Sequence, residues 1–418
     1  MTTLRRAIAN PVIVIFLASN VVNAGNLAFN VLFSRWMGPE LFGALATVLT
    51  VKLAALGVLG ALQIAVSHRV AQSSGAASGA LDAALAGLNR ALFAVATVGL
   101  PLVLAAVWFG GAGQALGLGS GVPLVVLLLA LPVAVPLSIL RGVAYGRLDV
   151  RAVLASTGLE MVVRLVGASL AWQAGLGLPG VVAALAVSIV AGWGPLVRLL
   201  PATEETTVWQ DTGRALALAA VPFAVLQASQ VVLLDGDVIL ARRLLGAGDA
   251  GLVAALSLFQ RVQFFACFGL AAVLLPSVGR ALADGRSARG PVAAVIALFG
   301  AVSALTMAGA VLAPGAVVDA FVGSSFQAAA PVLWIAAASA IAFTASYLSA
   351  TYLSASGDHA GIWILAAACP AQLWAMSVWS GDLHEMLSAK LAVQLSLAAI
   401  LLVRVAWRAP RAAALVPA

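Results

Sequence analysis

Two basic residues lie in the middle of long apolar segments, where a charge is costly. Lys52 follows Gly43 by nine residues and Arg261 follows Gly251 by ten, with no acidic residue near either in the sequence. At 1.5 Å per residue, both lie about midway along their predicted helices. Such a charge indicates a functional site unless it snorkels or pairs with a distant acid. We predict that Lys52 and Arg261 bind an anionic group of a substrate, with those structural roles as the alternative.

Amide side chains are the second polar feature of the apolar segments. The first predicted helix carries four and the corresponding helix of the second half carries two: Asn20, Asn23, Asn26 and Asn30, then Gln227 and Gln230. The four asparagines fall within roughly 120° of one helix face. Hydrogen bonding between helices is one interpretation and lining of a substrate cavity is the other. Four amides on one face exceed what packing requires, which favours the cavity.

Three further charged residues are possible substrate contacts, and each also has a simpler structural explanation. Arg164 lies one helical turn after Glu160, an acid within the same predicted span, so an intrahelical ion pair is expected. Lys390 lies nearer the end of its segment and can snorkel. No constellation of residues suggests catalysis, a metal site or a nucleotide-binding loop, so we expect neither an enzyme nor a cofactor.

The composition is that of a membrane protein throughout its 418 residues. Hydrophobic residues make up 63% and charged residues 9%, whereas soluble domains carry about 25% charged residues. Apolar segments of about 20 residues or more can each cross a bilayer core of roughly 30 Å as a helix. Twelve are predicted, at 11–34, 41–67, 84–108, 122–143, 152–173, 179–200, 213–234, 250–277, 291–313, 329–354, 360–380 and 385–407.

The distribution of basic residues sets the predicted topology. With both termini cytoplasmic, fifteen of the 22 Lys and Arg residues fall on the inner side. This positive-inside bias explains the net charge of +7 as orientation in the membrane. It therefore gives no indication of a nucleic-acid partner.

A short motif recurs after 208 residues, half the chain. Arg35, Gly38 and Gly43 correspond to Arg243, Gly246 and Gly251. Glycines also serve ordinary turns, which is the alternative explanation. Inner loops that end at residues 149 and 358 correspond at nearly the same offset.

A duplication with six helices per half predicts a parallel repeat. The expected fold is an all-α polytopic membrane protein of two pseudo-symmetric six-helix bundles around a central cavity. The bundles are predicted at 1–200 and 213–418, joined by a cytoplasmic linker at 201–212.

The motif Arg35-x-x-Gly38-Pro39-Glu40-x-Phe42-Gly43, with Asp237 and the degenerate second copy, resembles the polysaccharide flippases of the multidrug/oligosaccharidyl-lipid/polysaccharide exporter (MOP) superfamily. The twelve-segment plan extends the resemblance over nearly the whole chain. Related lipid II flippases have fourteen helices and basic cavity residues on helices 1, 2 and 8. Lys52 and Arg261 match the positions on helices 2 and 8, whereas helix 1 carries Asn, and Arg35 at its outer end is a candidate substitute. These departures argue against lipid II as the substrate.

The resemblance implies that the protein flips a polyprenyl-pyrophosphate-linked oligosaccharide by alternating access in a bacterial cytoplasmic membrane, for surface polysaccharide biosynthesis. Implied partners are this substrate, membrane lipids, and a polysaccharide polymerase or glycosyltransferases. One alternative is an organic-cation antiporter of the multidrug and toxin extrusion (MATE) branch, which needs an embedded acid. Another is a non-transporting partner of a polysaccharide synthase, in which the mid-membrane cations would be dispensable.

Overall fold

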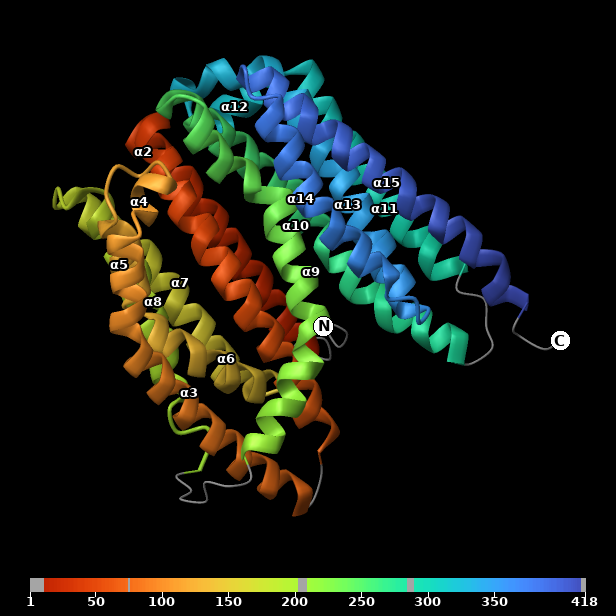
Figure 1. The fold of residues 1–418 in the computed structure, drawn as a ribbon. Coiled ribbons are helices and arrows are strands. Elements are labelled where there is room, and N and C mark those ends of the chain that lie inside the picture. Colours follow the sequence, from red (N-terminus) through yellow and green to blue (C-terminus); the bar gives the residue numbers. More distant parts are fainter. Residues whose placement is uncertain (1–10, 74–75, 202–208, 284–288, 415–418) are drawn as a thin grey trace, which may run out of the picture. The chain divides into compact units, whose positions relative to one another are not determined.

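The computed structural model describes residues 11–73, 76–201, 209–283 and 289–414. Within these ranges every regular element is a helix and none is a strand (Figure 1). Most of the predicted linker at 201–212 lies outside the described residues. The fold class predicted from the apolar segments is confirmed.

The longest helix is two membrane crossings rather than one. As a straight rod, α2 (Pro11–Gln72) would be about 93 Å long, roughly three times the hydrocarbon core of a bilayer. The helix is broken at Gly38, whose φ of 69° is a left-handed conformation that suits glycine. The break falls between the predicted segments 11–34 and 41–67.

The remaining crossings follow the predicted pattern. Ten described helices are long and apolar enough to span a membrane, and the pair α5 (Val122–Leu128) and α6 (Leu131–Gly146), bent by 43°, forms one more. Counting α2 twice gives the twelve predicted crossings in the described residues. The other helices are α3 (Ala76–Phe109), α4 (Ala112–Ala115), α7 (Val150–Gln173), α8 (Gly177–Trp193), α9 (Trp209–Leu244), α10 (Ala247–Ala283), α11 (Arg289–Leu312), α12 (Pro314–Val322), α13 (Leu333–Ala355), α14 (Ala360–Val378) and α15 (Leu383–Ala414).

The chain divides into two compact units. Unit 1 comprises Met1–Phe29 and Val51–Gln227, and unit 2 comprises Asn30–Thr50 and Ala228–Ala418. The long helices α2 and α9 therefore contribute to both. This division follows packing, so it does not test the boundary at residues 201–212, which was predicted from the repeat.

In unit 1, α7 packs along α8, and α3 packs along α6. Ile139 of α6, Leu85 of α3 and Val66 of α2 are buried together in one apolar cluster. Gly142 lets α6 approach α2 closely, because a Cβ there would lie 2.7 Å from Cβ of Val66. This tight contact fixes the position of the neighbouring Arg141.

In unit 2, α13 packs against both α10 and α15, and α14 packs against α15 (Figure 1). Aromatic rings fill the space between α10 and α13. The ring centroid of Phe264 lies 5.4 Å from that of Phe343 and 5.2 Å from that of Tyr347. Such large buried rings supply much of the apolar area that holds neighbouring helices together.

The two copies of the glycine motif meet inside unit 2. A Cβ on Gly43 would lie 3.0 Å from the backbone nitrogen of Gly251, and a Cβ on Gly251 would overlap the carbonyl oxygen of Pro39. Both glycines lie within helices, so a turn is not the reason for their presence. They permit a close backbone approach between α2 and α10.

The corresponding inner loops adopt the same turn. Leu148 and Gly357 both have a positive φ, of 52° and 80°. The next residue in each loop, Asp149 or Asp358, donates its N–H to the carbonyl five residues earlier, at 2.9 and 2.8 Å. Each aspartate also caps the following helix through Oδ1, at 3.0 and 3.1 Å. This matching local geometry supports the duplication predicted from the sequence.

Candidate functional site

A buried charge cluster occupies unit 1, where α2, α6 and α7 each contribute a side chain. Glu160 Oε2 accepts a hydrogen bond of 2.6 Å from Arg141 Nη2, and Glu160 Oε1 lies 3.8 Å from Lys52 Nζ. Lys52 is only 5% exposed. The Ser156 hydroxyl accepts from Arg141 Nε at 3.0 Å and donates to the Gly192 carbonyl at 2.7 Å. Arg141 is thereby held in position from two sides.

Positive charge exceeds negative charge in this cluster. Arg164 lies within electrostatic range of both Lys52 and Glu160, so three basic side chains surround one carboxylate. Arg141 makes the short hydrogen bond to that carboxylate. Lys52, at 3.8 Å, is too far away for a strong bond of this kind. The buried ammonium group therefore retains donor capacity for an anionic group.

The prediction of an ion pair between Glu160 and Arg164 is wrong. The carboxylate pairs with Arg141 and Lys52, which come from other helices. Tertiary packing brings these cations closer than the residue one turn away on the same helix. For the same reason Lys52 does have an acidic neighbour, although none is near it in the sequence.

In unit 2, the charge of Arg261 is balanced by a carboxylate. Arg261 Nε donates to Asp235 Oδ1 at 2.6 Å, and Nη2 donates to Thr50 Oγ1 at 3.4 Å. Asp235 is 3% exposed. Arg261 therefore forms a close ion pair with Asp235, in agreement with the structural alternative. Lys52 differs, because its carboxylate neighbour lies 3.8 Å away.

Lys390 of α15 is fully buried beside Asp237 of α9, with both side chains 0% exposed. Its ammonium group donates to Asp237 Oδ2 at 2.6 Å, Gln260 Oε1 at 2.7 Å and the Leu234 carbonyl at 2.9 Å. An ammonium group has three donors, so Lys390 is fully hydrogen-bonded. The prediction that Lys390 snorkels is wrong, because its acceptors lie inside the unit.

Two amides continue this polar network. Gln372 Nε2 donates to the Leu233 carbonyl at 3.1 Å, and Gln394 Nε2 donates to the same carbonyl at 2.7 Å. Gln394 also donates to Gln372 Oε1 at 3.1 Å. These bonds tie α14 and α15 to the segment of α9 that carries Asp235 and Asp237.

Asp235 and Asp237 lie within helix α9, beyond the end of the span predicted from the sequence. The predicted segment ended at residue 234, whereas α9 continues to Leu244. Two positions along a helix correspond to a rotation of about 200°, so the two carboxylates point to opposite sides. They consequently serve different cations, Arg261 and Lys390. The available signal was a pair of acids at the end of an apolar run.

The predicted amide residues have mixed environments. Asn23 is exposed and Asn26 is half-buried, while the side chain of Asn20 is not described. Gln227 lies beside Gly57 of α2 within unit 1. Gln230 belongs to unit 2, where its Oε1 is buried without a hydrogen bond from the described residues. Substrate binding by these amides stays a prediction.

Arg35 makes contacts at the C-terminal end of α12. Its Nη2 donates to the carbonyls of Asp319 and Ala320, at 3.1 and 2.9 Å. A cation is favourable there because the C-terminal end of a helix carries partial negative charge. The structure thus gives Arg35 a helix-capping contact within unit 2.

Solved structures of known proteins share the fold that carries these charge clusters. No family model and no curated protein sequence matches the chain. An inward-facing multidrug resistance MATE-family transporter of the MOP superfamily matches with a TM-score of 0.79 and 14% identity, covering 95% of this chain and 96% of that one. The lipid II flippase MurJ in an inward-closed conformation matches with a TM-score of 0.73 and 13% identity, covering 94% and 87%.

A third match is a MOP-superfamily transporter from Pyrococcus furiosus, described as having a binding pocket of reverse polarity. Its TM-score is 0.64 at 13% identity, with 98% of this chain and 95% of that one covered. The chain therefore has the two-lobed, all-helical membrane fold of the MOP-superfamily transporters and flippases.

Proposed function

We propose that the protein moves a polyprenyl-pyrophosphate-linked oligosaccharide across the cytoplasmic membrane by alternating access, for surface polysaccharide biosynthesis. Its fold is shared by a multidrug transporter and by a lipid II flippase, so the fold alone does not identify the substrate. The observation that carries the proposal is the excess of positive charge around Glu160, with Lys52 buried and loosely paired.

The charge of such a substrate requires basic groups within the membrane. A pyrophosphate group carries two or more negative charges, and it enters a membrane interior only where protein groups replace its hydration. Lys52 can donate charge-assisted hydrogen bonds to such a group, and the nearby Arg141 and Arg164 add to the favourable potential. Loss of one such buried contact costs about 1.5–3 kcal/mol or more.

Lys52 also offers a clean experiment. The change Lys52→Ala leaves Glu160 hydrogen-bonded to Arg141, so we expect normal membrane insertion. In a strain that lacks the native gene, the variant should fail to restore surface polysaccharide, whereas Lys52→Arg, which keeps the charge, should restore at least part of it. Normal export by Lys52→Ala would contradict the proposal.

Arg261→Ala should also stop export, but it leaves the buried Asp235 without its partner. The amount of this variant in the membrane must therefore be measured together with export. Lys52 is the sharper of the two tests, because its removal breaks no short ion pair.

A second candidate is a MATE-type antiporter of organic cations, and the buried carboxylates of α9 favour it. Asp235 and Asp237 are buried acids of the kind that such exchange requires, although neither lies within the span that was predicted from the sequence. In this case Asp235→Asn should abolish proton-driven uptake of a cationic dye, and Lys52→Ala should not. If neither variant changes export while deletion of the gene abolishes it, the protein acts as a scaffold for a synthase.

A further inference from the structure

Arg141 of α6 is the most firmly held cation of the charge cluster in unit 1. Its guanidinium makes three hydrogen bonds to α7: Nε donates to Ser156 Oγ at 3.0 Å, and Nη2 donates to Glu160 Oε2 at 2.6 Å and to the Ser156 carbonyl at 3.4 Å. The Ser156 hydroxyl donates in turn to the Gly192 carbonyl of α8 at 2.7 Å. The guanidinium is therefore fixed against two helices while it holds one oxygen of the Glu160 carboxylate.

Gly192 leaves the space that this guanidinium occupies. A Cβ at this position would lie 2.9 Å from Arg141 Nη2, 3.1 Å from the Ser156 carbonyl oxygen and 3.2 Å from Glu160 Cβ. Non-bonded atoms are most favourable at about 3.5–4.0 Å, so a methyl group there would push the end of the Arg141 side chain away. Gly192 lies within α8 and has no positive φ, so the backbone conformation does not require glycine. The requirement is the position of Arg141.

Arg141 and Lys52 share the same carboxylate. Glu160 forms one ion pair with Arg141 at 2.6 Å and one with Lys52 at 3.8 Å, and no third ion pair of Glu160 occurs among the described residues. An unpaired carboxylate is costly in a buried site. Without Arg141, Glu160 would therefore draw Lys52 into a short ion pair. The Lys52 ammonium would then lose the donors that an anionic substrate needs.

We propose that Arg141 is a positioning residue, which holds Glu160 so that this carboxylate does not neutralise Lys52. This inference rests on the proposed function and deepens it, because it explains how the Lys52 ammonium is kept available for the pyrophosphate group. Ser156 and Gly192 act through Arg141, the first by holding its guanidinium and the second by leaving room for it. Arg141 itself does not have to contact the substrate.

The charge balance separates this role from direct binding by Arg141. Lys52, Arg141 and Arg164 surround one carboxylate, which leaves an excess of two positive charges. Removal of Arg141 alone lowers this excess and frees Glu160 for Lys52. Removal of Arg141 together with Glu160 restores the same excess and leaves Lys52 without a carboxylate neighbour. A positioning role therefore predicts that loss of Glu160 compensates for loss of Arg141.

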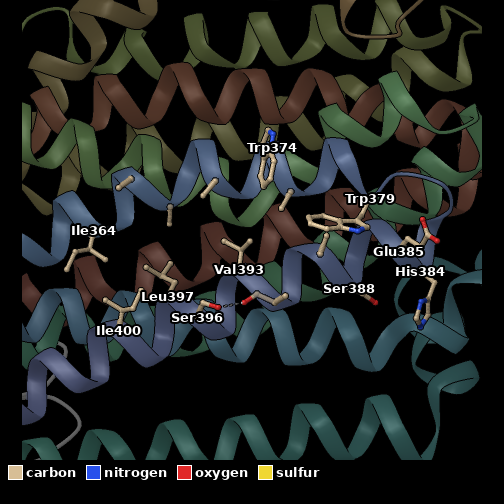
Figure 2. A pocket seen from close by; sticks show the side chains of 16 residues that line it. Ile364, Trp374, Trp379, His384, Glu385, Ser388, Val393, Ser396, Leu397 and Ile400 are labelled. Atoms are coloured by element: carbon tan, nitrogen blue, oxygen red, sulfur yellow. Dashed lines mark hydrogen bonds between the residues drawn. The ribbon is translucent and has the colours of Figure 1, made fainter.

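The large groove between α14 and α15 in unit 2 does not offer an alternative site for the pyrophosphate group. Its volume is about 920 Å³, and Figure 2 shows Glu385 at one end, with Ile364 and Ile400 at the other. No lysine or arginine is among the side chains that line it, all of which belong to the described part of the chain. The groove thus lacks the basic donors that bind phosphate groups strongly. We expect anion binding to report on the charge cluster of unit 1.

The experiment measures the Kd of tritiated polyprenyl pyrophosphate for the full-length protein in lipid nanodiscs. Arg141→Gln should weaken binding at least about tenfold, the effect of losing one charge-assisted contact of Lys52. Glu160→Gln should bind more tightly than the wild type, and the two changes combined should return the Kd to within about threefold of the wild-type value. The matched control is Arg147→Gln, which removes the 2.7 Å ion pair with Asp82 in the same unit and should bind like the wild type.

A second variant keeps all four charges and tests the proposal even where Arg141→Gln folds poorly. Gly192→Ala should weaken binding by displacing the Arg141 guanidinium, and addition of Glu160→Gln should recover it. Its control is Gly194→Ala, with nothing within 4 Å of the added methyl group. In addition, Arg141→Gln should cause no further loss in a Lys52→Ala background, because Arg141 acts through Lys52. A merely structural role of Arg141 would cause the same additional loss in both backgrounds.

The outcomes separate this inference from the proposed function. If the wild type binds the probe and the combined Arg141→Gln and Glu160→Gln variant binds as weakly as Arg141→Gln, then Arg141 contacts the substrate directly and the positioning role is overturned. Additive losses of Arg141→Gln and Lys52→Ala would overturn it as well. In both cases the flippase proposal stands. If the wild-type protein does not bind the probe above background, the inference falls together with the proposed function.

Discussion

The buried pair of Lys390 and Asp237 should be the most sensitive electrostatic contact in unit 2. Both side chains are 0% exposed and their charged atoms lie 2.6 Å apart. The substitution Lys390→Met leaves the carboxylate without its counter-ion, and Asp237→Asn leaves the ammonium without its own. Breaking a buried pair from one side costs about 3–5 kcal/mol, whereas removing both charges together is often nearly neutral.

The double-mutant cycle measures this coupling directly. Each single variant should lower the free energy of unfolding by about 3–5 kcal/mol, and Lys390→Met combined with Asp237→Asn should recover most of that loss. Unfolding of the purified protein by a denaturing detergent, followed by tryptophan fluorescence, provides the measurement. The matched control is Arg147→Met, because the Arg147–Asp82 pair has a similar distance of 2.7 Å but is 33% and 24% exposed. That change should cost no more than about 1 kcal/mol.

Two results would refute this reasoning. Single variants as stable as the wild type would show that water reaches the charged pair. A double variant that loses the sum of the two single effects would show that the residues act independently. In either case the buried ion pair could not be what ties α15 to α9.

Two other predictions concern backbone packing and pH. Gly251→Ala should lower the thermal stability and the yield, because the added methyl group would overlap the Pro39 carbonyl, while Gly246→Ala, with nothing within 4 Å, should behave like the wild type. Normal stability of Gly251→Ala would show that α2 and α10 separate easily. In the turn before α14, hydrogen bonds from Arg404 hold the pKa of Asp358 below its ordinary value of 3.8. The stability that Asp358 contributes should therefore be fully present above pH 3.8 and disappear as the pH falls through the lowered pKa. The unfolding midpoints of the wild type and Asp358→Asn should consequently differ at pH 7 and converge in acid.

Much of the fold could be predicted from the sequence, because membrane helices are determined by local composition. An apolar run of sufficient length spans the bilayer whatever its neighbours are. The break at Gly38 and the repeated glycines were likewise visible as local patterns. The structure adds that Gly43 and Gly251 meet each other, a contact between residues 208 positions apart that the repeat did not predict.

The charge clusters could be predicted only in part. Lys52 and Arg261 were recognisable because any charge in an apolar segment stands out. Their partners were not, because Glu160 and Asp235 come from other helices and pairing depends on tertiary packing. Asp235 was also hidden by an error of ten residues in the end of α9, since span boundaries are the least reliable part of a prediction from sequence.

The apparent symmetry of Lys52 and Arg261 was misleading for the same reason. Their depths match in the sequence, yet Arg261 makes a short bond to its carboxylate and Lys52 does not. The number and position of nearby acids decide whether a buried cation is available to a ligand.

The most direct test of the central claim is transport by the purified protein in liposomes. A fluorescent polyprenyl-pyrophosphate-linked oligosaccharide is placed in both leaflets, and its movement is followed by quenching from the outside. We expect translocation by the wild type, a reduction of at least about tenfold in Lys52→Ala, and partial recovery in Lys52→Arg. Equal translocation by wild type and Lys52→Ala, or none by the wild type together with proton-driven uptake of a cationic dye that requires Asp235, would contradict the central claim.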